Sequence, residues 1–149
     1  MNTATENKKL TITLTDRPPV KINENDWPVR ASASWKDWDN TYECQANRTW
    51  SAWIKVRQHI DGRTLVYGGY SYTTQFQGES DASYRGGQML TPNETQYPIA
   101  QRNEDHDWAG PEVIAAIREV GERLLERSDC EHFSDLIAEC IADLPAEEI

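Results

Sequence analysis

The sequence is short of cysteine and has no long apolar run, and each shortage excludes a class of protein. The three cysteines, Cys44, Cys130 and Cys140, show neither CxxC spacing nor an even count, which argues against a disulfide framework and a zinc site. The longest apolar run, Val113 to Ile117, is far shorter than a signal sequence or a membrane span. We therefore expect a cytoplasmic protein that has no membrane partner and whose thiols are free.

Motifs typical of catalysis are also missing. None of the three histidines belongs to a triad motif, and the pairs Gly68-Gly69 and Gly86-Gly87 lack the following Lys-Ser/Thr of a phosphate-binding loop. Glu104 to Asp107 contains metal-ligand types, but adjacent loop residues rarely converge on one ion. We expect no enzyme activity, no cofactor and no metal ion. His59 or His106 beside a carboxylate in a cleft would instead favour a small enzyme.

The composition is that of a folded domain. The 149 residues include 38% hydrophobic residues, six tryptophans and six tyrosines, which is more than a disordered chain normally carries. A chain of this length buries about two-thirds of the surface that its unfolded form exposes. We predict a single domain over 1–149, with a sheet in 1–75, a long connection in 76–110 and a helical hairpin in 111–145.

Apolar and polar residues alternate along much of the first half of the chain, and this pattern predicts strands at 10–15, 20–22, 29–35 and 42–56. Asp37 to Asn40 is expected to form a turn, and a bulge or bend is expected near Asn47 because the apolar face is interrupted there. In the long connection we expect one short helix or strand near Ala82 to Leu90.

The dipeptide Asp61-Gly62 is the strongest turn signal, because both central residues of a type I′ hairpin turn need positive φ. A two-residue turn there places Ile60 opposite Arg63. Cross-strand partners share a face, so this register predicts a core face and a mixed aromatic and basic face. The core face would carry Trp50, Ile54, Val56, Leu65 and Tyr67. The mixed face would carry Trp53, Lys55, Arg57, His59, Val66 and Tyr70.

Two amphipathic helices are predicted after residue 110. Pro111 suits a first helical position, and apolar residues at helical spacing continue to Leu124. Ser128 to Glu131 matches a capping box before a second helix, which Pro145 ends. We therefore predict an α+β domain: a mainly antiparallel sheet of four or five strands with a C-terminal antiparallel helix pair packed on one face.

Nearly all of the net charge lies in the C-terminal third. Residues 103–149 carry fourteen acidic side chains and three arginines, a net charge of −11, whereas residues 1–102 carry +1. Helical spacing aligns eight of these carboxylates on the outward faces of the two helices, although neighbours four residues apart repel each other. The resulting acidic face comprises Glu112, Glu119, Glu122, Glu126, Glu131, Asp135, Glu139 and Asp143.

Carboxylates four residues apart on a helix lie about 6 Å apart, whereas phosphates on one DNA strand lie about 3.4 Å apart. One row is therefore too sparse to imitate a phosphate backbone, and only the two rows side by side reach a similar density. Two alternatives stay open. The acidic face serves only solubility, or the mixed sheet face, with Trp53, Lys55, Arg57, His59 and Tyr70, binds single-stranded nucleic acid or a peptide.

Three stretches carry a resemblance to a known group: LTDRPPVKINENDWPV, YECQANRTWSAWIKVRQHIDGRTLVYGGY and LIAECIADLPAEE. Together they resemble small acidic accessory proteins of bacterial plasmids and integrative elements. The resemblance implies a setting of mobile DNA, in which acidic proteins act against restriction or CRISPR systems by occupying DNA-binding surfaces. The leading hypothesis is therefore an acidic interaction protein that blocks a basic, nucleic-acid-binding protein. Direct nucleic-acid binding is not expected, because the chain carries a net charge of −10. A homodimer is left open.

Overall fold

The computed structural model describes residues 8–15, 17–41, 46–91 and 111–144. It confirms the α+β class: a four-stranded antiparallel sheet, a two-stranded antiparallel hairpin and two C-terminal helices. The elements are β1 (Lys9–Ile12), β2 (Val20–Asn23), the 3-10 helix η2 (Glu24–Asp26), β3 (Val29–Thr41), β4 (Ala46–Gln58), β5 (Thr64–Thr74), β6 (Ala82–Leu90), α1 (Pro111–Ser128) and α2 (His132–Ala142).

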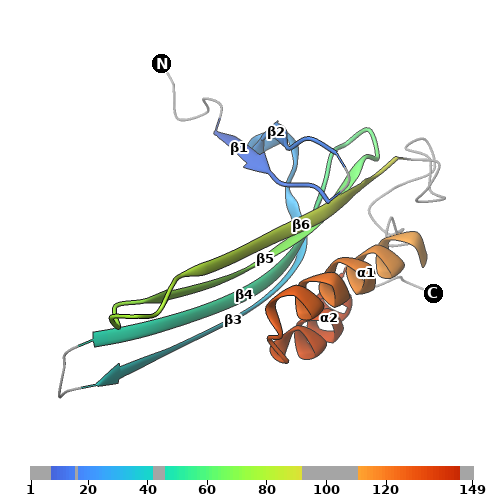
Figure 1. The fold of residues 1–149 in the computed structure, drawn as a ribbon. Coiled ribbons are helices and arrows are strands. Elements are labelled where there is room, and N and C mark those ends of the chain that lie inside the picture. Colours follow the sequence, from blue (N-terminus) through green and yellow to red (C-terminus); the bar gives the residue numbers. More distant parts are fainter. Residues whose placement is uncertain (1–7, 16, 42–45, 92–110, 145–149) are drawn as a thin grey trace.

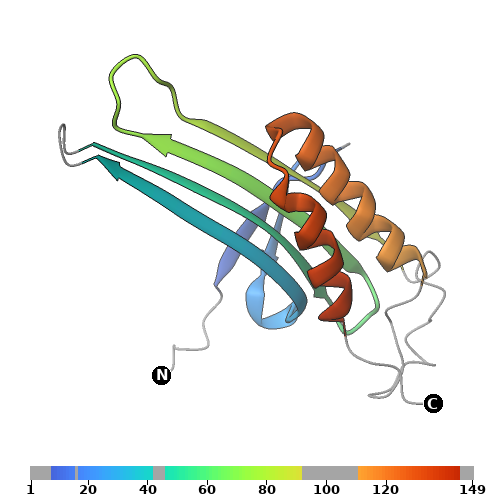
Figure 2. The same ribbon diagram turned by 90° about the horizontal axis from the view of Figure 1, so that it is seen from below.

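The large sheet has the strand order β3-β4-β5-β6, so β3 and β6 are its two edges. Both helices lie side by side against one face, with α1 over β5 and β6 and α2 over β3 and β4. They cover only one end of the sheet, and the strands extend well beyond them (Figure 1). The β1-β2 hairpin lies on the opposite face, which we call the outer face (Figures 1 and 2).

The main core lies between the sheet and the helices, as the helical stripes predict. Ala52, Ile54 and Val56 alternate along β4 and point to the helices, which bury Val113, Ile117, Val120, Leu124, Phe133, Leu136 and Cys140 against them. Each fully buried large apolar side chain contributes about 1.5–3 kcal/mol. Neither described helix is both long enough and apolar enough to cross a membrane.

A second, smaller core lies under the hairpin on the outer face. Ile12, Leu14, Ile22 and Trp27 pack there against Leu65 and Tyr67 of β5. The segment after β1 is fastened to the edge of the sheet, because Thr15 N donates to Gly87 O at 2.8 Å and Gly87 N donates to Thr15 Oγ1 at 3.1 Å. The hairpin therefore has a fixed position over one end of the outer face.

The predicted register of β4 and β5 is wrong by one residue. Gln58 pairs with Thr64, and His59 N donates to Arg63 O at 2.9 Å, which leaves three residues in the turn. Gly62 has φ 101°, and its N–H donates to His59 O, as in a three-residue hairpin loop that ends in a left-handed glycine. A one-residue slip exchanges the faces of a strand. Leu65 and Tyr67 therefore lie on the outer face, and Val66 and Tyr70 lie on the helix face.

Other local predictions also need correction. The stretch Asp37 to Asn40 is not a turn, because β3 runs through it, and the ladder irregularity lies between Val29 and Ala31 rather than near Asn47. The expected long connection over 76–110 contains β6, so the element favoured near Ala82 to Leu90 is a strand that belongs to the sheet.

The capping box is wrong as well. Ser128 is the last residue of α1, and its hydroxyl donates to Leu124 O at 2.6 Å and accepts from Cys130 N at 3.1 Å. The side chain of Glu131 makes no cap hydrogen bond to α2. The turn between the helices instead uses Asp129 at φ 59°, a left-handed conformation that Asp tolerates better than most residues.

Candidate functional site

The predicted acidic side chains lie on the helices or, for Glu131 and Asp143, at the two caps of α2, and most are exposed. Glu112 is half-buried, and the other seven are exposed: Glu119, Glu122, Glu126, Glu131, Asp135, Glu139 and Asp143. Two of the eight make contacts inside the molecule. Glu119 Oε1 accepts from Gln88 Nε2 on β6, and Asp143 Oδ2 accepts from Ser32 N on β3 at 2.9 Å.

Those two contacts fix the arrangement of the rows. β3 and β6 are the opposite edges of the sheet, so the α1 row leans toward one edge and the α2 row toward the other. The seam between the helices is apolar, with Gly121 of α1 directly against Ile137 of α2. The two acidic rows therefore flank the helix pair on opposite sides and do not combine into one surface of phosphate-like density.

The alternative sheet site is brought together only in part. Trp53, Lys55 and Arg57 share the outer face, as predicted, but Tyr70 faces the helices. His59 lies in the β4-β5 turn, where its Nδ1 accepts from Asp61 N at 3.1 Å and its ring lies 5.1 Å from that of Trp27.

The carboxylate of Asp61 lies beside His59, at 3.2 Å from Nδ1, but it is already bound by Arg63 through N at 2.9 Å and Nε at 2.8 Å. These contacts lower the pKa of Asp61, against the effect of its partial desolvation. His59, Asp61 and Arg63 therefore hydrogen-bond to one another within the β4-β5 turn. His106 lies outside the described residues.

The four long strands separate charge between their two faces. The register places four basic residues on the outer face: Lys36, Lys55, Arg57 and Arg85. The acidic residues in the described parts of these strands are Asp37 and Asp39, and both face the helix side. The outer face is therefore locally cationic on a chain whose net charge is −10.

A cleft of about 340 Å³ opens on the outer face between β1 and the strands β4 to β6. Trp53 lines it, with Lys55 Nζ at 5.6 Å and Arg85 Cζ at 5.5 Å from the centre of the indole ring. The indole lies on Gly69, since a Cβ at that position would come within 2.9 Å of Trp53 Cζ2. The lining also includes Thr11, Thr13 and one acidic residue, Glu24.

Arg57 forms the buried wall of this cleft. It is 7% exposed and donates to Tyr67 Oη at 2.7 Å and to Trp27 O at 2.9 Å, with Glu24 at 3.7 Å. Burial raises the pKa of Tyr67, and the hydrogen bond from Arg57 partly opposes this effect. Arg57 is thus held as a fixed positive charge behind the cleft, while Lys55 and Arg85 are more accessible.

Beyond the cleft the outer face is flat and rich in hydroxyl groups. Lys36, Ser51, Ser71 and Ser83 form one row across the four strands, directly next to the row of Trp53 and Arg85. Trp38 lies one row further out and is 66% exposed. The offset of four positions between its row and that of Trp53 corresponds to about 13 Å along a strand. Neither the helices nor the hairpin cover this part of the sheet (Figure 1).

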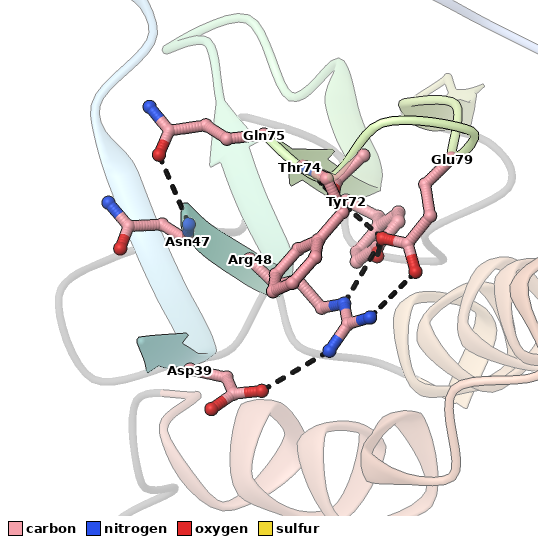
Figure 3. A network of polar contacts seen from close by, with 8 residues as sticks. Asp39, Asn47, Arg48, Tyr72, Thr74, Gln75 and Glu79 are labelled. Atoms are coloured by element: carbon pink, nitrogen blue, oxygen red, sulfur yellow. Dashed lines mark hydrogen bonds and ion pairs between the residues drawn. The ribbon is translucent and has the colours of Figure 1, made fainter. Parts of the chain in front are cut away.

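The far end of the sheet is held by a polar network on the helix-side face (Figure 3). Arg48 of β4 donates to both carboxylate oxygens of Glu79, through Nε at 3.1 Å and Nη2 at 2.7 Å, and contacts Asp39 at 3.4 Å. Tyr72 Oη and Thr74 Oγ1 donate to the same carboxylate. The network raises the pKa of Arg48 and lowers that of Glu79 to about 2, mainly through their mutual hydrogen bonds.

Sequence reasoning missed Lys36, Trp38 and Arg85. Lys36 precedes the turn expected at Asp37 to Asn40, Trp38 lies inside that turn, and Arg85 lies in the expected connection, so none of the three had an assigned face. Among the described residues no group of three or more His, Cys, Asp or Glu side chains is placed to hold a metal ion. Comparison with protein-family models, curated proteins and solved structures finds no match for the chain.

Proposed function

We propose that this protein is a non-enzymatic binding module whose outer sheet face holds single-stranded nucleic acid. The observation that carries the proposal is the separation of charge: the outer face has four basic residues and no carboxylate among the described residues of β3 to β6. Two tryptophans, Trp38 and Trp53, lie on the same face. Aromatic side chains beside cations bind single strands by base stacking and phosphate contact.

The net charge of −10 disfavours phosphate binding if the charge is averaged over the whole chain. The described acidic rows, however, lie on the helix side of the sheet, across from the outer face, so they oppose binding at that face less than the net charge implies. Screening limits the reach of exposed charges to about 8 Å at physiological salt. Lys36, Lys55 and Arg85 are the accessible cations, so the expected slope of log affinity against log salt is about −2 for a single strand.

The test is a fluorescence-anisotropy titration of a labelled single-stranded oligonucleotide at several salt concentrations, with the duplex of the same sequence alongside. The variant Lys55→Gln/Arg85→Gln should weaken single-strand binding about tenfold and flatten the salt dependence. Lys21→Gln/Arg118→Gln removes the same charge from exposed positions outside the cleft and serves as the control. Equal loss in both variants, or no binding at low salt, would refute the proposal.

One specific observation favours a second candidate function. Five exposed carboxylates have no hydrogen bond or ion pair with the described residues: Glu122, Glu126, Glu131, Asp135 and Glu139. They fit the leading sequence hypothesis, a surface that captures a basic nucleic-acid-binding protein. Because the rows lie on opposite flanks, such a partner would contact one row rather than both. Either function suits the mobile-DNA setting that the sequence resemblance implies.

The α2 row provides the test of this second function. Glu131→Gln/Asp135→Asn/Glu139→Gln should abolish binding of an arginine-rich peptide and leave oligonucleotide binding intact or slightly stronger. Electrostatic capture also predicts a steep fall in association rate with added salt. A peptide affinity that is unchanged by the triple substitution would remove the acidic rows from consideration.

A further inference from the structure

Three arginines that the sequence pattern did not select gather at the β6 edge of the sheet. Arg85 of β6 and Arg123 and Arg127 of α1 line a cavity of about 190 Å³. This edge cavity adjoins the cleft beside Trp53, because Thr13 and Arg85 line both. A cationic path therefore runs from the outer face around the edge of β6 to the first helix.

The cavity has a fixed frame. Its outer wall, Thr13 to Thr15, is held to β6 by the two hydrogen bonds between Thr15 and Gly87. Its inner wall is α1, where Arg123 and Arg127 are four residues apart and thus lie on the same side of the helix. Arg127 Cζ is 5.5 Å from the ring of Tyr84, a cation–π contact that restrains the guanidinium.

One arginine that lines the edge cavity also has unmet hydrogen-bonding capacity. Arg123 Nη2 donates to Glu119 at 3.2 Å, but Arg123 Nη1 is buried and has no hydrogen-bond partner among the described residues. A buried donor without a partner is costly, and native proteins rarely leave one unless a ligand or water satisfies it. No carboxylate of the described part of the chain lines the cavity. Guanidinium groups in such a setting match the geometry of phosphate oxygens.

We infer that the edge cavity is a second phosphate subsite, into which a single strand passes after it crosses the outer face. The inference rests on the proposed function and extends it, because it gives the strand a direction: over Arg85, around the edge of β6, and onto Arg123 and Arg127. A liquid water occupies about 30 Å³, so the cavity has room for a tetrahedral anion. Acidic peptides remain the competing ligand class that the experiment must separate.

The experiment compares oligonucleotides of about 4 and about 12 nucleotides, which span the usual site sizes of single-strand binders. The short one fills the outer face alone, and the long one also reaches the edge cavity. Arg123→Gln/Arg127→Gln should weaken the long oligonucleotide about tenfold and the short one less than twofold. For the long oligonucleotide, the slope of log affinity against log salt should fall in magnitude by about 1.4, because two phosphate contacts are lost.

The control is Lys21→Gln/Arg118→Gln, which removes the same charge outside both cavities. Arg123 also pairs with Glu119, so Arg127→Gln alone keeps the test valid if the double variant does not fold. Equal losses for both lengths, or a loss no larger than the control's, would overturn the subsite and leave the proposed function standing. Failure of the unaltered protein to bind either oligonucleotide would overturn both the subsite and the proposed function. Both would also be overturned if polyglutamate of matched charge displaced the labelled oligonucleotide as well as unlabelled oligonucleotide does.

Discussion

Arg48 and Glu79 form a two-pronged ion pair that joins β4 to the connection after β5, although 31 residues separate them in the sequence. Thr74 and Tyr72 donate to the same carboxylate at 2.6 and 2.7 Å. Phe76 lies under the guanidinium, with Arg48 Cζ 4.0 Å from the ring. This arrangement fixes the end of the sheet that the helices do not cover, and it lies on the face opposite Trp38.

The first prediction concerns acid stability. The pKa of Glu79 is lowered to about 2, first by the hydrogen bond from Arg48 and then by those from Thr74 and Tyr72. A carboxylate with a depressed folded pKa stabilises the fold above its unfolded pKa, and the contribution is lost as pH falls toward the folded value. Urea unfolding should therefore show unaltered protein more stable than Glu79→Gln at pH 7, with the difference shrinking between pH 4.5 and about 2.

The control for this titration is Glu126→Gln, which changes an exposed carboxylate that has no partner among the described residues. Its effect on the free energy of unfolding should be small at every pH. Parallel pH profiles for the unaltered protein and Glu79→Gln would show that the ion pair adds nothing to stability, as is common for exposed pairs.

The second prediction tests the seam between the helices. An alanine Cβ at position 121 would lie 2.3 Å from Ile137 Cγ1 and 2.6 Å from Cδ1. Alanine gains about 1 kcal/mol of helix propensity over glycine, but overpacking a tight contact costs about 1–3 kcal/mol. Gly121→Ala should therefore lower the free energy of unfolding, and Ile137→Ala in the same chain should restore part of the loss. Additive effects of the two changes would contradict the contact.

The helices and the register of β4 and β5 show what sequence could predict and what it could not. Stripes at helical spacing identify α1 and α2 because a helix determines its own periodicity, and Val113, Ile117, Val120 and Leu124 are all buried. The dipeptide Asp61-Gly62 suits both a two-residue turn and a three-residue loop with Gly62 in the left-handed region. Long-range packing of the whole strand decides between them, and that choice moved Tyr70 to the other face.

The candidate site was harder to predict than the fold for the same reason. Trp53, Lys55 and Arg57 lie on one strand and follow from alternation alone. Arg85, Arg123 and Thr13 come from three distant segments and meet only when the hairpin, β6 and α1 are docked. The acidic rows follow from helical spacing alone, but their divergence depends on which edge strand each helix covers.

The third prediction concerns the buried arginine behind the cleft. Tyr67→Phe removes the hydroxyl that accepts from Arg57 Nε at 2.7 Å and leaves that donor buried. An unsatisfied donor of this kind costs about 1–3 kcal/mol, with more for charged groups. The free energy of unfolding should fall by about that amount. Tyr84→Phe is the control, since its hydroxyl makes no hydrogen bond with the described residues, and a similar loss in both would contradict the role assigned to Tyr67.

The last prediction separates function from stability at Trp38. The side chain is 66% exposed, so Trp38→Ala should change the free energy of unfolding by less than about 0.5 kcal/mol. Stacking of one base on an aromatic side chain is worth about 1–3 kcal/mol, which converts to a loss of about fivefold to 150-fold in oligonucleotide affinity. Trp38→Phe should retain part of that affinity. Ile60→Ala removes another exposed apolar side chain, 82% exposed in the β4-β5 turn, and should leave binding unchanged. Loss of binding in the Ile60 variant, or full binding by Trp38→Ala, would exclude Trp38 as a stacking platform.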